Sequence, residues 1–153
     1  MNERPFLIDV IVVRMIKVVA YTDGGARGNP GPAGIGVQII DERGKVLKEV
    51  SKFIGNSTNN YAEYQAVATA LDTLKKMYGK RTKEMDFELR MDSELVKKQL
   101  NGEYQIKEPG LVPLFIEIHN FRVSNFPHLK LTHVRREKNK EADRLVNEAI
   151  DAA

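Results

Sequence analysis

The first third of the chain alternates short apolar runs with turn residues, a pattern typical of β-strands. Residues 17–22 are mostly apolar and β-branched and run into Asp23-Gly24-Gly25, a cluster that should end a strand. Residues 35–40 and 45–54 predict two further strands, with a turn over residues 41–44 between them. Three strands joined by short connections predict an antiparallel meander.

Helical periodicity follows after residue 58. Apolar side chains recur every three or four positions, at Ala62, Ala66, Val67, Ala70, Leu71, Leu74 and Met77. Alternating Phe87, Leu89 and Met91 predict a fourth strand, and residues 93–100 a short helix. We expect a break at 109–113, a helix over 114–126, a fifth strand over 130–134 and an amphipathic helix over 139–152. This order predicts an α/β fold with a mixed sheet and helices packed on it.

Composition narrows the class of protein without identifying it. The length of 153 residues suits one domain with a real core, because two domains would each be marginal. No apolar run approaches the roughly 20 residues of a spanning helix, so we expect no membrane insertion. The absence of cysteine excludes disulfides, thiolate metal sites and a cysteine nucleophile. Lys and Arg outnumber Asp and Glu by 24 to 21, a mild excess that suits a polyanionic partner.

Residues 1–14 stand apart from this pattern. The run PFLIDVIVV could serve as a weak signal-peptide core, but Asp9 and the lack of a small-residue cleavage site argue against one. Met15 opens the segment where the domain pattern begins. We therefore expect a domain over residues 15–153. The role of residues 1–14 stays open between an extension, an expression remnant and an extra edge strand.

Four acids are candidates for chemistry, and each has an ordinary alternative. Asp23 follows an apolar strand and precedes two glycines, as a turn aspartate would. Glu63 lies three residues after Asn60, where a capping-box glutamate is expected, but it also shares a line with the apolar stripe. Asp92 ends a strand and could cap the next helix. Asp143 lies at the edge of an apolar stripe, and a solvated helix face is its default.

Taken together, these acids suggest a metal site. Two lie at strand ends and two on helix faces directed toward the sheet, so they could converge on one edge. Carboxylates brought within a few ångströms repel each other unless a cation neutralises them. Oxygen ligands without His or Cys favour Mg²⁺ or Mn²⁺ over zinc. Two such ions, about 4 Å apart, can generate hydroxide and stabilise the leaving oxygen of a phosphodiester displacement.

Four sequence blocks resemble type 1 ribonucleases H, in the prokaryotic ribonuclease HI form. They are YTDGGARGNPGPAGIG (21–36), STNNYAEYQA (57–66), Met91-Asp92-Ser93 and REKNKEADRLVNEA (136–149). They occur in family order, so the resemblance covers residues 15–153. It implies that the metal ligands are Asp23, Glu63, Asp92 and Asp143. It also implies a five-stranded sheet, an antiparallel meander plus parallel strands, with helices on both faces.

The resemblance further implies an endonuclease that cuts the RNA strand of RNA–DNA hybrids with two Mg²⁺ (or Mn²⁺) ions, leaving a 5′-phosphate and a 3′-hydroxyl. Selectivity would depend on 2′-hydroxyl and backbone contacts rather than on base reading. Family positions that touch the hybrid correspond to Gly24, Gly25, Asn29, Asn59 and Asn60. A turn role for Asn29 and a helix cap for Asn60 are the alternatives. We expect a monomer in the cytoplasm, and cleavage of double-stranded RNA stays open.

Three departures from the family concern the substrate side of the site. The loop that carries a mobile histidine in many members is shortened, and His133 should end a strand, so Arg135 or Arg136 is the candidate helper that would meet phosphate. Glu94 stands where some members have a substrate-contacting glutamine, and that role is not carried over. The basic protrusion is missing from residues 101–115. Hybrid binding would then be weaker, or would be supplied by lysines for which a solvated face is the favoured alternative, namely Lys97, Lys98 and Lys107.

Three other classes of protein compete with this interpretation. One is a hybrid-binding module without catalysis, although a binder gains nothing from mutually repelling carboxylates. Another is a structure-specific nuclease of the same fold, transposase-like or Holliday-junction-cutting, because one scaffold hosts several chemistries. The block at 21–36 favours ribonuclease H over it. The third is an α/β domain with dispersed surface acids.

Overall fold

A single five-stranded mixed sheet organises the molecule. The computed structural model describes residues 15–153, so the extension predicted at residues 1–14 lies outside the described residues. The strand order is β3-β2-β1-β4-β5, with β1 antiparallel to β2, β2 antiparallel to β3, and β4 and β5 parallel to β1. The strands are β1 (Lys17–Ala26), β2 (Gly31–Asp41), β3 (Val46–Ser57), β4 (Asp86–Met91) and β5 (Leu129–His133). The predicted meander followed by parallel strands is confirmed.

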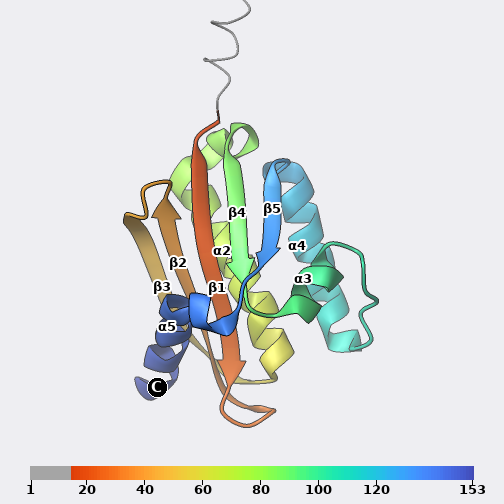
Figure 1. Cartoon of the computed structure of the whole chain (residues 1–153). Helices are drawn as coiled ribbons and strands as arrows, with labels where there is room; N and C mark the ends of the chain where they lie inside the picture. The colour runs from red at the N-terminus through yellow and green to blue at the C-terminus, as the bar shows by residue number, and fades with distance from the viewer. Residues whose placement is uncertain (1–14) are drawn as a thin grey trace, which may run out of the picture.

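Helices cover both faces of the sheet, as expected. They are α2 (Asn59–Tyr78), α3 (Glu94–Leu100), α4 (Val112–Asn125) and α5 (Lys140–Asp151), with short 3-10 turns η1 (Gly79–Glu84), η2 (Pro109–Leu111) and η3 (Arg136–Lys138). Helices α2 and α4 lie behind the sheet in Figure 1, and α5 crosses its front over β1 and β2. Within residues 15–153, no helix is long and apolar enough to cross a membrane.

The main core lies between the sheet and the helices α2, α3 and α4. Side chains point alternately to the two faces of a strand. Phe87, Leu89 and Met91 of β4 therefore join Val18 and Ala20 of β1 on the side of α2. Helix α2 contributes the stripe predicted from its periodicity, which is almost completely buried from Ala62 to Leu74. The core thus holds α2 rigidly against the centre of the sheet.

Strand β1 is longer than predicted, because Asp23-Gly24-Gly25 does not end it. Residues 23–26 continue the antiparallel ladder, pairing with residues 36–33 of β2. A side chain on Gly24 would collide with the backbone of Ala62 in α2. A side chain on Gly36, on β2, would collide with the carbonyl of Ala142 in α5. Glycine is required at both positions because α2 and α5 approach the sheet backbone too closely to leave room for a side chain.

Candidate active site

Three of the four predicted acids meet at one edge of the sheet. Asp23 lies in β1, Glu63 in the first turns of α2, and Asp92 directly after β4. Each offers a carboxylate oxygen, and these oxygens all lie within 4.8 Å of one another. Asp143 is exposed in the first turn of α5, outside that group, but close enough to raise the pKa of Asp23. The alternative of dispersed surface acids is therefore wrong for Asp23, Glu63 and Asp92.

The topology explains this convergence. Strands β1 and β4 are parallel neighbours with Thr22 opposite Met91, so the next residues, Asp23 and Asp92, lie side by side. Glu63 follows Ala62, the residue at which α2 touches β1. Asp143 follows Ala142, the residue at which α5 touches β2 from the other face. Each helical acid is thus placed one residue from the point of closest approach between its helix and the sheet.

The helix caps are made by other residues, which leaves the acids free. Thr58 is the N-cap of α2, and its hydroxyl accepts a hydrogen bond from the Tyr61 N–H at 3.2 Å. Ser93 is the N-cap of α3, and its hydroxyl accepts from the Val96 N–H at 3.2 Å. The capping alternatives for Asn60 and Asp92 are therefore wrong. A threonine or serine cap satisfies the free N–H groups of the first turn as well as an acid would.

Crowding of the carboxylates disfavours their charged forms. Burial, followed by the charges of Asp92, Glu63 and Asp143, raises the pKa of Asp23 from its ordinary 3.8 to about 8. The Gly24 N–H, which donates to Asp23 at 3.0 Å, opposes this change. Burial likewise raises the pKa of Glu63 to about 7, against the lowering effect of the Ser93 hydroxyl. Near neutral pH, Asp23 and Glu63 would therefore compete for protons unless a cation balanced their charge.

The residues present fit a divalent cation. A small pocket of about 10 Å³ is lined by Asp23, Glu63 and Asp92 together with Val67 and Val96. The Oε2 atom of Glu63 is buried and has no hydrogen-bond partner among the described residues. A buried carboxylate oxygen normally has a hydrogen-bond partner or binds a cation, and a cluster of carboxylates is sufficient to bind a divalent cation. The three clustered side chains offer carboxylate oxygens, the kind of ligand that suits Mg²⁺ or Mn²⁺.

Asn139 is part of the site and was not predicted from the sequence. Its side chain is buried, and its Nδ2 donates to the Thr22 carbonyl at 2.9 Å and to Oδ2 of Asp92 at 3.3 Å. An asparagine before a helix is ordinarily interpreted as a cap, yet this side chain makes no capping hydrogen bond. No sequence signal distinguishes the two roles, because both partners lie far away along the chain.

The predicted substrate residues Asn29 and Asn59 lie together beside the acids. The Asn59 N–H donates to Oδ1 of Asn29 at 3.0 Å, and Oδ1 of Asn59 accepts from the Ala26 N–H at 2.8 Å. Nδ2 of Asn60 donates to Glu108 at 2.8 Å. The bonds of Asn29 and Asn59 tie the turn after β1 to the start of α2, whereas that of Asn60 ties α2 to the residue before η2. Asn29 and Asn59 are both exposed.

The two glycines differ in their surroundings. A side chain on Gly24 would meet α2, so close helix packing explains this glycine without a bound ribose. A Cβ on Gly25 would lie 3.9 Å from Val146 and 4.0 Å from Asn59, at ordinary contact distances. Packing therefore accounts for the glycine at position 24 but does not require the one at position 25.

The candidate helpers lie on an exposed segment next to the acids. Arg135 and Arg136 are exposed, and the charge of Arg136 lowers the pKa of Glu63. His133 ends β5, as expected, with Nδ1 3.8 Å from Glu94. Glu94 also forms an ion pair with Lys98 at 3.5 Å, and the Lys98 ammonium contacts the hydroxyl of Tyr104. Lys98 therefore already has partners on the protein surface.

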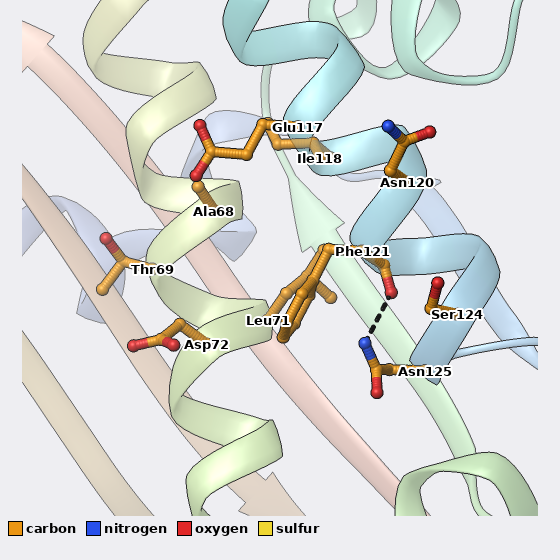
Figure 2. A pocket seen from close by; sticks show the side chains of 10 residues that line it. All are labelled: Ala68, Thr69, Leu71, Asp72, Glu117, Ile118, Asn120, Phe121, Ser124 and Asn125. Atoms are coloured by element: carbon orange, nitrogen blue, oxygen red, sulfur yellow. Dashed lines mark hydrogen bonds between the residues drawn. The ribbon is translucent and has the colours of Figure 1, made fainter.

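A second hollow, of about 580 Å³, lies between α2 and α4 and contains none of the predicted site residues (Figure 2). Leu71 and Phe121 form its floor, and Asp72 and Glu117 lie at its edges. Nδ2 of Asn125 is bound to the Phe121 carbonyl at 3.1 Å. The charged groups around this hollow do not converge, unlike the acids at the sheet edge.

The sheet order, with acids supplied by two strands and by helices on opposite faces, defines an α/β domain of the ribonuclease H fold. Comparison with known proteins agrees with this class. Residues 21–149 match the reverse transcriptase-like family. The solved structure of LC11-RNase H1, isolated from compost, is 53% identical, with a TM-score of 0.86 and coverage of 90% of this chain and 98% of that one. The same protein in complex with an RNA/DNA hybrid is 52% identical, with a TM-score of 0.84 and coverage of 88% and 97%.

Curated relatives point to the same family. Ribonuclease HI of Halobacterium salinarum is 40% identical over 137 residues, covering 90% of this chain and 66% of the relative. A bifunctional protein of Mycobacterium tuberculosis is 39% identical over 139 residues, covering 90% of this chain. The chain spans only 36% of the length of that protein. The chain belongs to the ribonuclease H family, and within it to the type 1 proteins of prokaryotes.

Proposed function

We propose that this chain is an endonuclease that hydrolyses the RNA strand of RNA–DNA hybrids with divalent metal ions. The observation that carries the proposal is the meeting of Asp23, Glu63 and Asp92 within 4.8 Å at the sheet edge. Their mutual repulsion is tolerated in proteins mainly where a cation or a shared proton balances it. The hybrid bound by LC11-RNase H1, at 52% identity, supports the substrate.

The acids would divide the work of holding two ions, Mg²⁺ or Mn²⁺. Asp23, Glu63 and Asp92, which are half-buried, would be the clustered ligands, and exposed Asp143 would complete the set from the opposite face of the sheet. Bound ions of this kind lower the pKa of a coordinated water and stabilise the charge on phosphate oxygens. Hydrolysis of this kind would leave a 5′-phosphate and a 3′-hydroxyl.

The exposed residues beside the acids would bind the hybrid. Oδ1 of Asn29 accepts from the Asn59 N–H and Oδ1 of Asn59 accepts from the Ala26 N–H, so both side chains are fixed and their NH₂ groups would face 2′-hydroxyls and sugar oxygens. Gly25 would let the nucleic acid backbone approach β1 closely, and Gly24 and Asn60 would contribute from the same region. Arg136, near Glu63, would meet phosphate, with Arg135 as its neighbour.

We further propose that residues 15–153 constitute the ribonuclease H domain and residues 1–14 an extension. A monomer suffices for the activity, because one chain supplies all four acids. Double-stranded RNA is a secondary substrate to be tested. The cytoplasm is the proposed location, and the lack of cysteine is compatible with its reducing conditions.

The first test is a cleavage assay with end-labelled substrates of one sequence: RNA–DNA hybrid, RNA duplex, DNA duplex and single-stranded RNA. With Mg²⁺ or Mn²⁺, we expect cuts in the RNA of the hybrid, and none in EDTA. Asp92→Asn should abolish most cleavage, whereas Asp72→Asn, at an exposed acid of α2, should leave it unchanged. A folded chain that cuts no substrate with either metal would refute the proposal. Full activity of Asp143→Asn would remove Asp143 from the ligand set.

A further inference from the structure

The buried asparagine at the start of α5 connects three of the elements that carry the acids. The Nδ2 group of Asn139 donates to the Thr22 carbonyl, one residue before Asp23, and to the Asp92 carboxylate. The Asn139 carbonyl accepts from the Asp143 N–H at 3.1 Å. Through one residue, the interior of β1, the residue after β4 and the first turn of α5 are therefore joined.

The orientation of this amide follows from its neighbours. Both the Thr22 carbonyl and the Asp92 carboxylate are acceptors, so only the NH₂ side of Asn139 can face them. The amide oxygen then points away, and it is buried without a hydrogen-bond partner among the described residues. An unsatisfied buried oxygen costs stability. Asn139 is only 1% exposed, yet it therefore contributes less to the stability of the fold than such burial would suggest.

We infer that Asn139 is a positioning residue that holds Asp92, the β1 backbone before Asp23 and the helix start before Asp143 in the arrangement that binds divalent cations. The inference rests on the proposed function. A hydrogen bond donated to one oxygen of Asp92 restricts rotation of the carboxylate and leaves its other oxygen for a cation. Groups that orient ligands in this way typically change metal affinity ten- to a hundredfold when removed.

The test is a titration of Mn²⁺ into the full chain by calorimetry, for the wild type, Asn139→Ser and Asn120→Ser. Serine at position 139 removes both donated hydrogen bonds but keeps a good residue for a helix N-cap. Asn120 is exposed on α4 and serves as the matched control. We expect Asn139→Ser to bind Mn²⁺ at least tenfold more weakly, and the control to match the wild type.

Kinetics separate positioning from a general loss of structure. In Asn139→Ser, the Mg²⁺ concentration for half-maximal cleavage should rise at least tenfold, while KM for the hybrid stays within about twofold. Wild-type Mn²⁺ affinity and wild-type metal activation in this variant would overturn the inference. A wild type that neither binds Mn²⁺ nor cleaves the hybrid would instead refute the proposed function.

A second measurement needs no variant, should Asn139→Ser fail to fold. In the wild type, the two Nδ2 protons of Asn139 should exchange slowly with solvent, because both are buried and bonded. Their NMR resonances should shift when Mg²⁺ is added, and those of Asn120 should not. Rapid exchange, or resonances that do not respond to Mg²⁺ while other site signals do, would contradict the role.

Discussion

Removal of one carboxylate from the acid cluster should stabilise the metal-free protein. In the folded chain the pKa of Asp23 is about 8, against an ordinary value of 3.8. At one pKa unit per 1.36 kcal/mol, this difference corresponds to about 5–6 kcal/mol in a dry site, and about half of that once solvent screens the partly accessible group. Asp23→Asn removes this cost and keeps the shape of the side chain.

The direction of the pH dependence follows from the difference between the folded and unfolded pKa values. Because the folded pKa is raised, Asp23 does not destabilise the fold below about pH 4, where it is neutral in both states. Its cost grows as pH rises and is complete above about pH 8. Glu63, with a folded pKa of about 7, adds a similar trend over a narrower range. The metal-free wild type should therefore lose stability from pH 4 to pH 8.

Thermal unfolding in EDTA measures this effect. At about 2–4 °C per kcal/mol for a domain of this size, Asp23→Asn should unfold roughly 5–10 °C above the wild type at pH 8, and the difference should disappear at pH 4. Mg²⁺ should raise Tm in the wild type and much less in the variant. Asp72→Asn, exposed and paired with Lys76, is the control and should change Tm by about 1 °C at most. Equal Tm values for Asp23→Asn and wild type from pH 4 to pH 8 would refute the reasoning.

Three further predictions address other parts of the molecule. Changing Arg135 and Arg136 to alanine should slow hybrid cleavage roughly tenfold or more while Mn²⁺ affinity stays the same, since their proposed role is toward phosphate; unchanged rates would remove that role. Burial opposes ionisation of Glu88, but hydrogen bonds from neighbouring arginine and threonine side chains lower its pKa to about 2. Glu88→Gln should therefore cost about 1–2 kcal/mol in urea unfolding at pH 7, a loss that fades as pH falls toward 2. Gly24→Ala should cost about 1–3 kcal/mol and reduce cleavage, because the added methyl collides with Ala62; wild-type stability would show that α2 can move aside.

The sequence predicted the fold well because most elements carry a strong pattern. The apolar stripe of α2 and the alternating apolar residues of β4 both face the core. Such faces repeat with the period of a helix or a strand and can therefore be recognised in the sequence. The end of β1 was predicted wrongly, because Asp23-Gly24-Gly25 has the composition of a turn. What keeps it in the sheet is pairing with β2 and close contact with α2, which the sequence does not record locally.

Prediction of the site was limited in the same way, because local patterns can be recognised in the sequence and contacts between distant residues cannot. The four acids could be identified as candidates, and motif order strengthened the choice. Asn60 and Asp92 suited helix caps as well as Thr58 and Ser93 did, and only the folded structure separates them. The role of Asn139 depends on contacts that span 117 residues to Thr22 and 47 to Asp92. No local pattern encodes contacts of that kind.

The two glycines that contact the helices set the distance between α2 and α5 across the sheet. Gly24 and Gly36 lie on neighbouring strands, and each touches a helix on the opposite face from the other. Between Glu63 and Asp143 there is consequently backbone rather than side-chain packing at the points of contact. The thickness of the backbone does not depend on which side chains fill the core. The core of such a protein can therefore change over evolution while the distance between its two helical acids stays the same.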